Sequence, residues 1–178
     1  MKAFAFITVA LLLACAVVVG AAAAQSVSDD HQIIPGDRIG PLKIGMSITD
    51  AVAAMGQPKT VLPDKKVRGE TRYYWFDITE LGGNSVTSAH GLFAVADSSG
   101  TIVWVAAHYA PQYLTPSGLH YGSTERQVLA AMGKPTSVDN TYVDDQGKHA
   151  AHLLVFKGVE FLIYDLDRSE TVIVVAVR

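Results

Sequence analysis

Few side chains in this sequence could carry covalent chemistry. Its single cysteine, Cys15, lies inside an apolar N-terminal segment, where we expect removal or lipidation rather than a nucleophilic role. The spacings typical of serine hydrolases (G-x-S-x-G), zinc proteases (H-E-x-x-H) and phosphate-binding loops do not occur. We therefore predict that the chain is not an enzyme, with no catalytic residue and no cofactor.

Two groups of side chains could be considered as metal ligands. They are His149 and His152 with Asp144 and Asp145, and Asp165 with Asp167 and Glu170. The histidine spacing of three suits a helix, but the context predicts a loop entering a strand, where such side chains point to opposite faces. The second group lacks the glycine and closing glutamate of a calcium loop. We predict polar turns and no metal site.

Aromatic and charged residues in the predicted strands are better candidates for binding. In residues 101–109, one alternate set (Val103, Val105, Ala107) is typical of a core, and the other contains Trp104 and His108. Trp, Tyr and Arg on an exposed sheet face are the residues that protein interfaces favour. The predicted binding residues are Tyr73, Trp75, Trp104, His108, Glu160, Tyr164 and Arg178. The alternative is that Trp75 and Trp104 are core residues.

The N-terminal segment predicts export. Lys2 precedes a nearly uninterrupted apolar run, and Ala22, Ala23 and Ala24 form a small-residue cleavage site before Gln25, so residues 1–24 are predicted to be a signal peptide. Two alternatives are a membrane anchor and a lipobox ending at Cys15, which would place a lipid anchor in the outer membrane. We expect a periplasmic or secreted protein that is membrane-bound only if it is lipidated at Cys15.

The charge balance excludes some partners. The chain has 14 basic and 17 acidic residues, and removal of Lys2 with the signal peptide changes the net charge from −3 to −4. There is no run of more than two lysine or arginine residues, so the electrostatic pattern of nucleic-acid binding is missing. We predict no nucleic-acid partner.

A sequence repeat organises the chain. Residues 42–61 align without gaps with residues 119–138, at an offset of 77, and 8 of the 20 positions are identical. In each copy Ser47 or Thr124 is a predicted helix N-cap, and Gly56 or Gly133 is followed two residues later by proline. The interpretation is a tandem duplication: a flexible leader (25–35), repeat unit 1 (36–112) and repeat unit 2 (113–178).

Strand-like segments follow each predicted helix. They are residues 71–78, 91–96 and 101–109 after the first, and 138–143, 153–156, 159–164 and 171–177 after the second. Short turns between them imply antiparallel pairing, and residues 80–88 and 144–148 are predicted to be irregular loops. The predicted fold is α+β, with two helix-plus-antiparallel-sheet repeats whose helices cover one sheet face and leave the other open.

The motif Gly-Met-Ser-x-x-x-Ala-x-x-x-x-Gly-x-Pro at residues 45–58, followed by aromatic strands, resembles the SmpA/OmlA family of outer-membrane assembly lipoproteins. The doubled arrangement resembles the β-lactamase-inhibitor-protein-like (BLIP-like) fold. The resemblance covers most of residues 36–178 and implies a place in the cell envelope and protein binding through an open, concave sheet.

These observations favour a non-catalytic binding or assembly module, or an enzyme inhibitor, whose partner is another envelope or secreted protein. The alternative is a periplasmic protein that binds a small ligand or a cell-wall fragment. An open aromatic face would favour the first, and a closed apolar cavity with a few polar groups the second.

Overall fold

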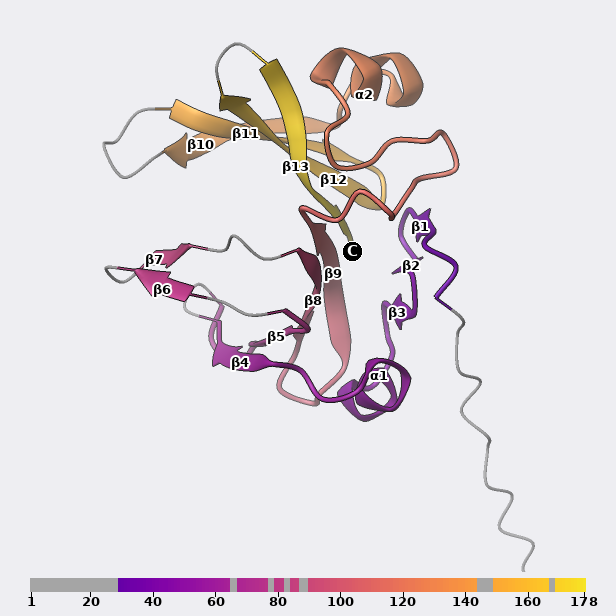
Figure 1. Cartoon of the computed structure of the whole chain (residues 1–178), viewed down its shortest axis with the longest axis vertical. Helices are drawn as coiled ribbons and strands as arrows, with labels where there is room; N and C mark the ends of the chain where they lie inside the picture. The colour runs from indigo at the N-terminus through magenta and orange to yellow at the C-terminus, as the bar shows by residue number, and fades with distance from the viewer. Residues whose placement is uncertain are drawn as a thin grey trace, which may run out of the picture.

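The computed structural model describes residues 29–64, 67–76, 79–81, 84–86, 90–143, 149–166 and 169–178. The fold is α+β and is dominated by one large antiparallel sheet, with two short helices in the described residues (Figure 1). The prediction of an α+β fold built on antiparallel strands is confirmed at this level. None of the helices described is long and apolar enough to cross a membrane.

The large sheet has eight strands and mixes both halves of the chain. In spatial order they are β10 (Ser137–Val143), β11 (His149–Phe156), β12 (Val159–Leu166), β13 (Ser169–Val177), β9 (Ile102–His108), β8 (Gly91–Ala96), β5 (Thr71–Tyr74) and β4 (Thr60–Pro63). Every neighbouring pair is antiparallel. The central pair, β13 and β9, joins the two halves edge to edge.

Two smaller sheets accompany the large one. They are β1 (Ile33–Ile34), β2 (Arg38–Ile39) and β3 (Leu42–Lys43), and the hairpin of β6 (Thr79–Leu81) and β7 (Asn84–Val86). The hairpin falls where an irregular loop was predicted, and that part of the prediction is wrong. Strand β4 was not predicted either.

Both helices begin and end where the sequence predicts. In α1 (Ile48–Met55) and α2 (Glu125–Met132), the cap hydroxyls of Ser47 and Thr124 accept hydrogen bonds from main-chain amides three residues on, at 3.1 and 3.3 Å. The side chain of Gln127 accepts from the Thr124 amide at 2.8 Å, which completes a capping box. Gly56 and Gly133 follow with φ of 78° and 77°, a conformation that favours glycine.

The larger of two hydrophobic clusters lies between the large sheet and the helices, and the smaller one includes Phe93, Ala106 and Ala176 on the other sheet face. Ala51 of α1 and Val128 of α2 are fully buried in one cluster with residues of β8, β9, β11, β12 and β13. Ile33, Ile39 and Leu42, from the three small strands, are fully buried in the same cluster. Figure 1 shows both helices and β1–β3 on one side of the sheet, which curves away from them.

Residues 29–36, the first that the structure describes, are part of the fold. The amide of Ile33 donates to the Leu114 carbonyl at 2.8 Å, and that of Gly36 donates to the Gly158 carbonyl at 2.7 Å. The predicted flexible leader is therefore wrong for residues 29–35, because β1 lies within them and Ile33 is buried. Residues 25–28, the predicted signal peptide and Cys15 lie outside the described residues.

A β-bulge changes which residue of β9 enters the core. Val95 pairs with Trp104 but Ala96 pairs with Ile102, so Val103 is an extra residue in its strand. Ile102 is fully buried in the core, whereas Val103 is half-buried. The prediction that Val103 faces the core is therefore wrong, although Trp104 does lie on the opposite face.

Candidate binding face

We call the sheet surface that faces away from the helices the concave face. Cross-strand partners share a face, so the registers assign its residues. They include Arg72 and Tyr74 on β5, Phe93 and Val95 on β8, Trp104, Ala106 and His108 on β9, Val174 and Ala176 on β13, Glu160, Leu162 and Tyr164 on β12, and Leu153 on β11. Neither helix packs on this face (Figure 1).

Two alanines create a hollow at the centre of the concave face. Ala106 and Ala176 pair across the two central strands, and Phe93 and Glu160 flank them in the same row. Larger side chains surround this row, and they leave a pocket of about 370 Å³. Its lining residues are Arg72, Phe93, Trp104, Leu153, Glu160, Leu162, Val174 and Ala176.

Glu160 is a buried carboxylate in this hollow. The residue is only 5% exposed. The Trp104 indole nitrogen donates to its Oε2 at 3.4 Å, which is long for a hydrogen bond. Arg178 Nε lies 2.8 Å from Oε1, close enough for an ion pair, but outside hydrogen-bonding geometry, so the buried Oε1 receives no hydrogen bond.

A second hollow of about 380 Å³ adjoins the first. Its lining residues are Asp64, Glu70, Arg72, Val95, Val103, Trp104 and Arg178. Arg72 and Trp104 line both hollows. Arg72 Nε is 2.6 Å from Asp64 Oδ2. Partial burial opposes the charge of Arg72, but hydrogen bonds to Asp64 and Tyr74 raise its pKa, so the guanidinium stays charged.

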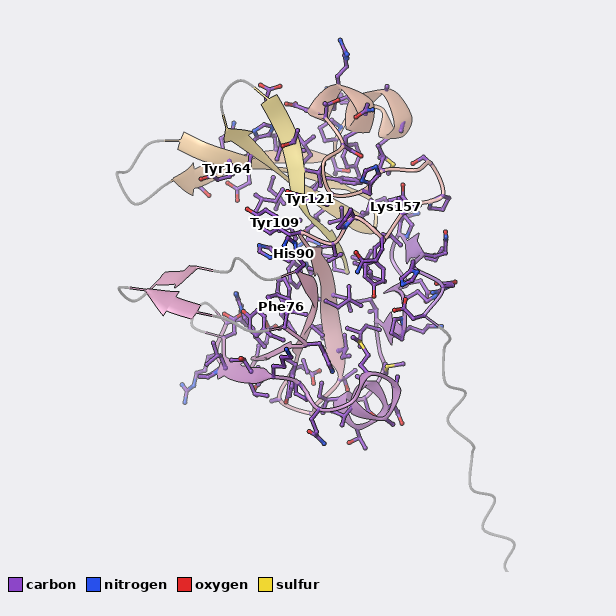
Figure 2. The ribbon with its side chains drawn as sticks, in the orientation of Figure 1. Phe76, His90, Tyr109, Tyr121, Lys157 and Tyr164 are labelled. Carbon is purple, nitrogen blue, oxygen red and sulfur yellow. The ribbon has the colours of Figure 1, made fainter. Side chains whose placement is uncertain are left out.

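An aromatic cluster lies beside the hollow on the concave face, at the C-terminal end of β9. The rings of Phe76 and His108 stack at 5.9 Å, and Tyr109 contacts the rings of His108, Tyr121 and His90 at 4.4, 5.1 and 5.8 Å. Figure 2 shows Phe76, His90, Tyr109, Tyr121 and Tyr164 gathered between the two arms of the sheet. Burial, and then the nearby Tyr121 and Tyr164, raise the pKa of Tyr109.

The structure brings five of the seven predicted binding residues to one face. Trp104, Glu160 and Arg178 meet at the central hollow. His108 and Tyr164 lie on the same face, with the aromatic cluster.

Tyr73 and Trp75 lie on the opposite face, so their grouping with Trp104 is wrong. Tyr73 pairs with Ala94 of the core, and Trp75 packs on the core while its indole nitrogen donates to the Gly56 carbonyl at 2.9 Å. The alternation within β5 was predicted correctly, but its phase relative to β9 depends on the register. Sequence reasoning also missed Arg72, Phe93 and Leu162. The alternation of side chains in their strands could have identified them, had it been known which alternate set faces the same side as Trp104.

His149 and His152 lie in strand β11, which begins four residues earlier than the predicted strand 153–156. His152 Nε2 lies 3.2 Å from Glu125 of α2, so its side chain contacts the helix. In the part of the chain that the structure describes, no three His, Cys, Asp or Glu residues are placed to hold a metal ion. Asp144, Asp145 and Asp167 lie outside that part.

No protein-family model and no curated protein sequence matches this chain. Two solved structures are similar. One is a cysteine-rich secretory protein (SAV1118) from Staphylococcus aureus, with a TM-score of 0.47 and 17% identity over 80% of this chain and 46% of that one. The other is a DUF4309 family protein (YjgB) from Bacillus subtilis, with a TM-score of 0.48 and 16% identity over 80% of this chain and 87% of that one. This chain thus spans less than half the length of the staphylococcal protein, and neither similarity bears on function.

Proposed function

We propose that this protein is a non-catalytic binding module of the bacterial cell envelope, which docks another envelope or secreted protein on its concave face and can act as an assembly factor or enzyme inhibitor. The observation that carries the proposal is the central hollow. There a half-buried tryptophan, a phenylalanine and a buried carboxylate lie side by side on a sheet face that neither helix covers. Interface hot spots are enriched in aromatic residues and cluster in such well-packed pockets.

A second candidate function is the binding of a small ligand or cell-wall fragment. The hollow of about 370 Å³ lies at the small end of the range of ligand sites, about 300 to 1,000 Å³. Against this candidate, the hollow is only partly enclosed, and Arg72 and Trp104 line both it and the adjoining hollow. A protein surface can cover both hollows at once, and a small ligand fills one.

The same proposal includes a duplicated origin for residues 36–112 and 113–178, and the resemblance to the SmpA/OmlA family and the BLIP-like fold. Matched main-chain bonds support the duplication. The Gly45 amide donates to the Ile102 carbonyl and the Ile102 amide donates to Met46; in the other half, Gly122, Val172 and Ser123 make the same pair of bonds.

The bulges support the duplication as well. Leu162 pairs with Val174 and Ile163 with Val172, so Ile173 is the extra residue of β13, as Val103 is in β9. Val103 and Ile173 occupy the same place relative to these matched bonds.

Export is the remaining part of the proposal. It rests on the apolar N-terminal segment with its cleavage site after residue 24. Mass spectrometry of the N-terminus of the protein from its own cells tests it. A terminus at Gln25 supports a soluble exported form, a lipidated Cys15 supports an anchored one, and an intact N-terminus in the cytoplasm contradicts export.

The binding function is tested by affinity capture from envelope and secreted fractions of the organism that makes the protein. The tag is placed before Gln25, because Arg178 belongs to the proposed site. Trp104→Ala is the test variant, and Trp75→Phe, on the opposite face, is the matched control. We expect the wild type and Trp75→Phe to retain one partner that Trp104→Ala loses.

The captured partner is then purified and its affinity measured by calorimetry. A hot-spot tryptophan implies a loss of roughly thirtyfold or more on truncation. Equal affinity of wild type and Trp104→Ala, or no capture by the folded wild type, would contradict the proposal.

A further inference from the structure

Among the carboxylates that the structure describes, Glu160 is unusual because it is buried without full compensation. Its Oε1 is buried and accepts no hydrogen bond. A buried charged group normally receives hydrogen bonds from fixed partners, since an unsatisfied carboxylate oxygen is costly in a low-dielectric environment. The two groups beside it, Trp104 at 3.4 Å and Arg178, leave that requirement partly unmet. Glu160 therefore has the capacity to accept another donor.

The surroundings of this oxygen suit an alkyl chain that carries a positive charge. Leu153, Leu162 and Val174 supply aliphatic walls to the hollow. Phe93 and Trp104 supply aromatic surfaces, with ring centroids 5.0 Å apart at an interplanar angle of 61°. A cation attracted to an aromatic face gains further stabilisation next to a carboxylate. The charge of the nearby Arg72 is balanced by Asp64, at 2.6 Å.

We infer that the hollow binds a primary alkylammonium group, presented as a lysine side chain of the partner protein, with its Nζ donating to Glu160 Oε1. The inference rests on the proposed docking function and names the group that the concave face recognises. A lysine fits better than an arginine because Oε2 is occupied by the Trp104 indole, so the single oxygen that remains matches a point donor and not a bidentate fork.

Arg178 acts as a displaceable counter-ion in this arrangement. Its side chain is 57% exposed, so it can return to water at little cost when a better-placed ammonium group arrives. It therefore competes with the ligand for Glu160. Removal of its charge should strengthen the binding of an ammonium group, whereas removal of the Glu160 charge should abolish the preference for one.

The experiment uses residues 25–178 labelled with ¹⁵N, and follows the indole signals of the two tryptophans by NMR. The Trp104 indole N–H points at Glu160 and reports on the hollow, and that of Trp75, bonded to Gly56, is an internal control. Trp75→Phe assigns the two signals. The probes are Nα-acetyl-lysine N-methylamide and the norleucine analogue, which has the same alkyl stem without the ammonium group.

We expect the lysine probe to shift the Trp104 signal with an affinity on the order of millimolar, about tenfold tighter than the norleucine probe, because one charge-assisted hydrogen bond is added. Glu160→Gln should remove this preference. Arg178→Gln should tighten lysine binding several-fold and leave norleucine binding unchanged. An unmoved Trp75 signal in each variant shows that the fold is intact.

Equal affinity for the two probes, or a lysine preference that survives Glu160→Gln, would overturn the inference. Weaker lysine binding in Arg178→Gln would also overturn it, because Arg178 would then help to hold the ligand instead of competing with it for Glu160. These outcomes are separate from the proposed function. Trp104-dependent capture of a partner without lysine preference refutes the lysine site alone, and lysine preference with no captured protein refutes docking and leaves a site for free amines.

Discussion

The two halves of the molecule share several backbone features. Each has a capped two-turn helix, a glycine with positive φ after it, four strands in the large sheet, and a bulge in its last strand. Their last strands, β9 and β13, meet at the middle of the sheet. The features that match are therefore those that fix the path of the chain.

The concave side chains of the two halves differ. Phe93 pairs with Ala106 in the first half, and Glu160 pairs with Ala176 at the corresponding place in the second. Trp104 likewise corresponds to Val174, each beside the bulge of its strand. The first half thus supplies the aromatic wall of the hollow and the second half its carboxylate. A backbone with two similar halves can therefore carry an asymmetric site, because the side chains on its concave face differ between the halves.

The largest expected effect on stability is at Gly158 in the second half, where the backbone of Gly36 lies close to it. A Cβ at this position would meet the Gly36 nitrogen at 2.6 Å, and φ is +78°. Gly133 has nearly the same φ, but nothing lies within 4 Å of its added Cβ. We expect Gly158→Ala to lower the free energy of unfolding by about 3 kcal/mol and Gly133→Ala by about 1 kcal/mol. Urea denaturation measures both.

An equal loss in the two glycine variants would show that the N-terminal segment adjusts without cost. The close approach of Gly36 to Gly158 would then not require a glycine at position 158.

The next largest effect on stability is expected at the buried residue of each helix. Ala51 and Val128 occupy equivalent positions, and both are fully buried. We expect Val128→Ala to lower the free energy of unfolding by about 2 kcal/mol through lost apolar burial, and Ala51→Val to lower it by about 1 to 3 kcal/mol through overpacking. Chemical denaturation of the single and double variants is the measurement. The double variant should show the sum, because independent sites add. Stabilisation by Ala51→Val would contradict tight packing under the first helix.

The smallest effect concerns the caps. Ser47→Ala and Thr124→Ala each remove one hydroxyl that accepts a main-chain hydrogen bond. We expect each to cost about 1 kcal/mol, and the two costs to agree within about 0.5 kcal/mol. Thermal unfolding followed by circular dichroism gives both values, with wild type as the reference. A much larger loss in one half would break the equivalence of the two helices.

The sequence predicted the helices and the longer strands well because their signals are local. The caps, the glycines and the proline after each helix act within a few residues, and β8 was predicted with its observed bounds. The small strands were missed. Each of β1, β2 and β3 has two residues, too few for a pattern of alternation, and their burial comes from contacts with distant parts of the chain.

The sequence by itself determined the two helices and the alternation of side chains within single strands, since helix caps and strand pleats depend on neighbouring residues. The tertiary structure decided how those alternations combine. The register of β5 with β8 placed Tyr74 on the concave face and Tyr73 on the covered one. Pairing across β9, β13 and β12 brought Trp104 to Glu160 and buried the carboxylate. Register and bulges depend on pairs of strands. The sequence of one strand therefore does not determine which of its two alternate sets of side chains lies on the concave face.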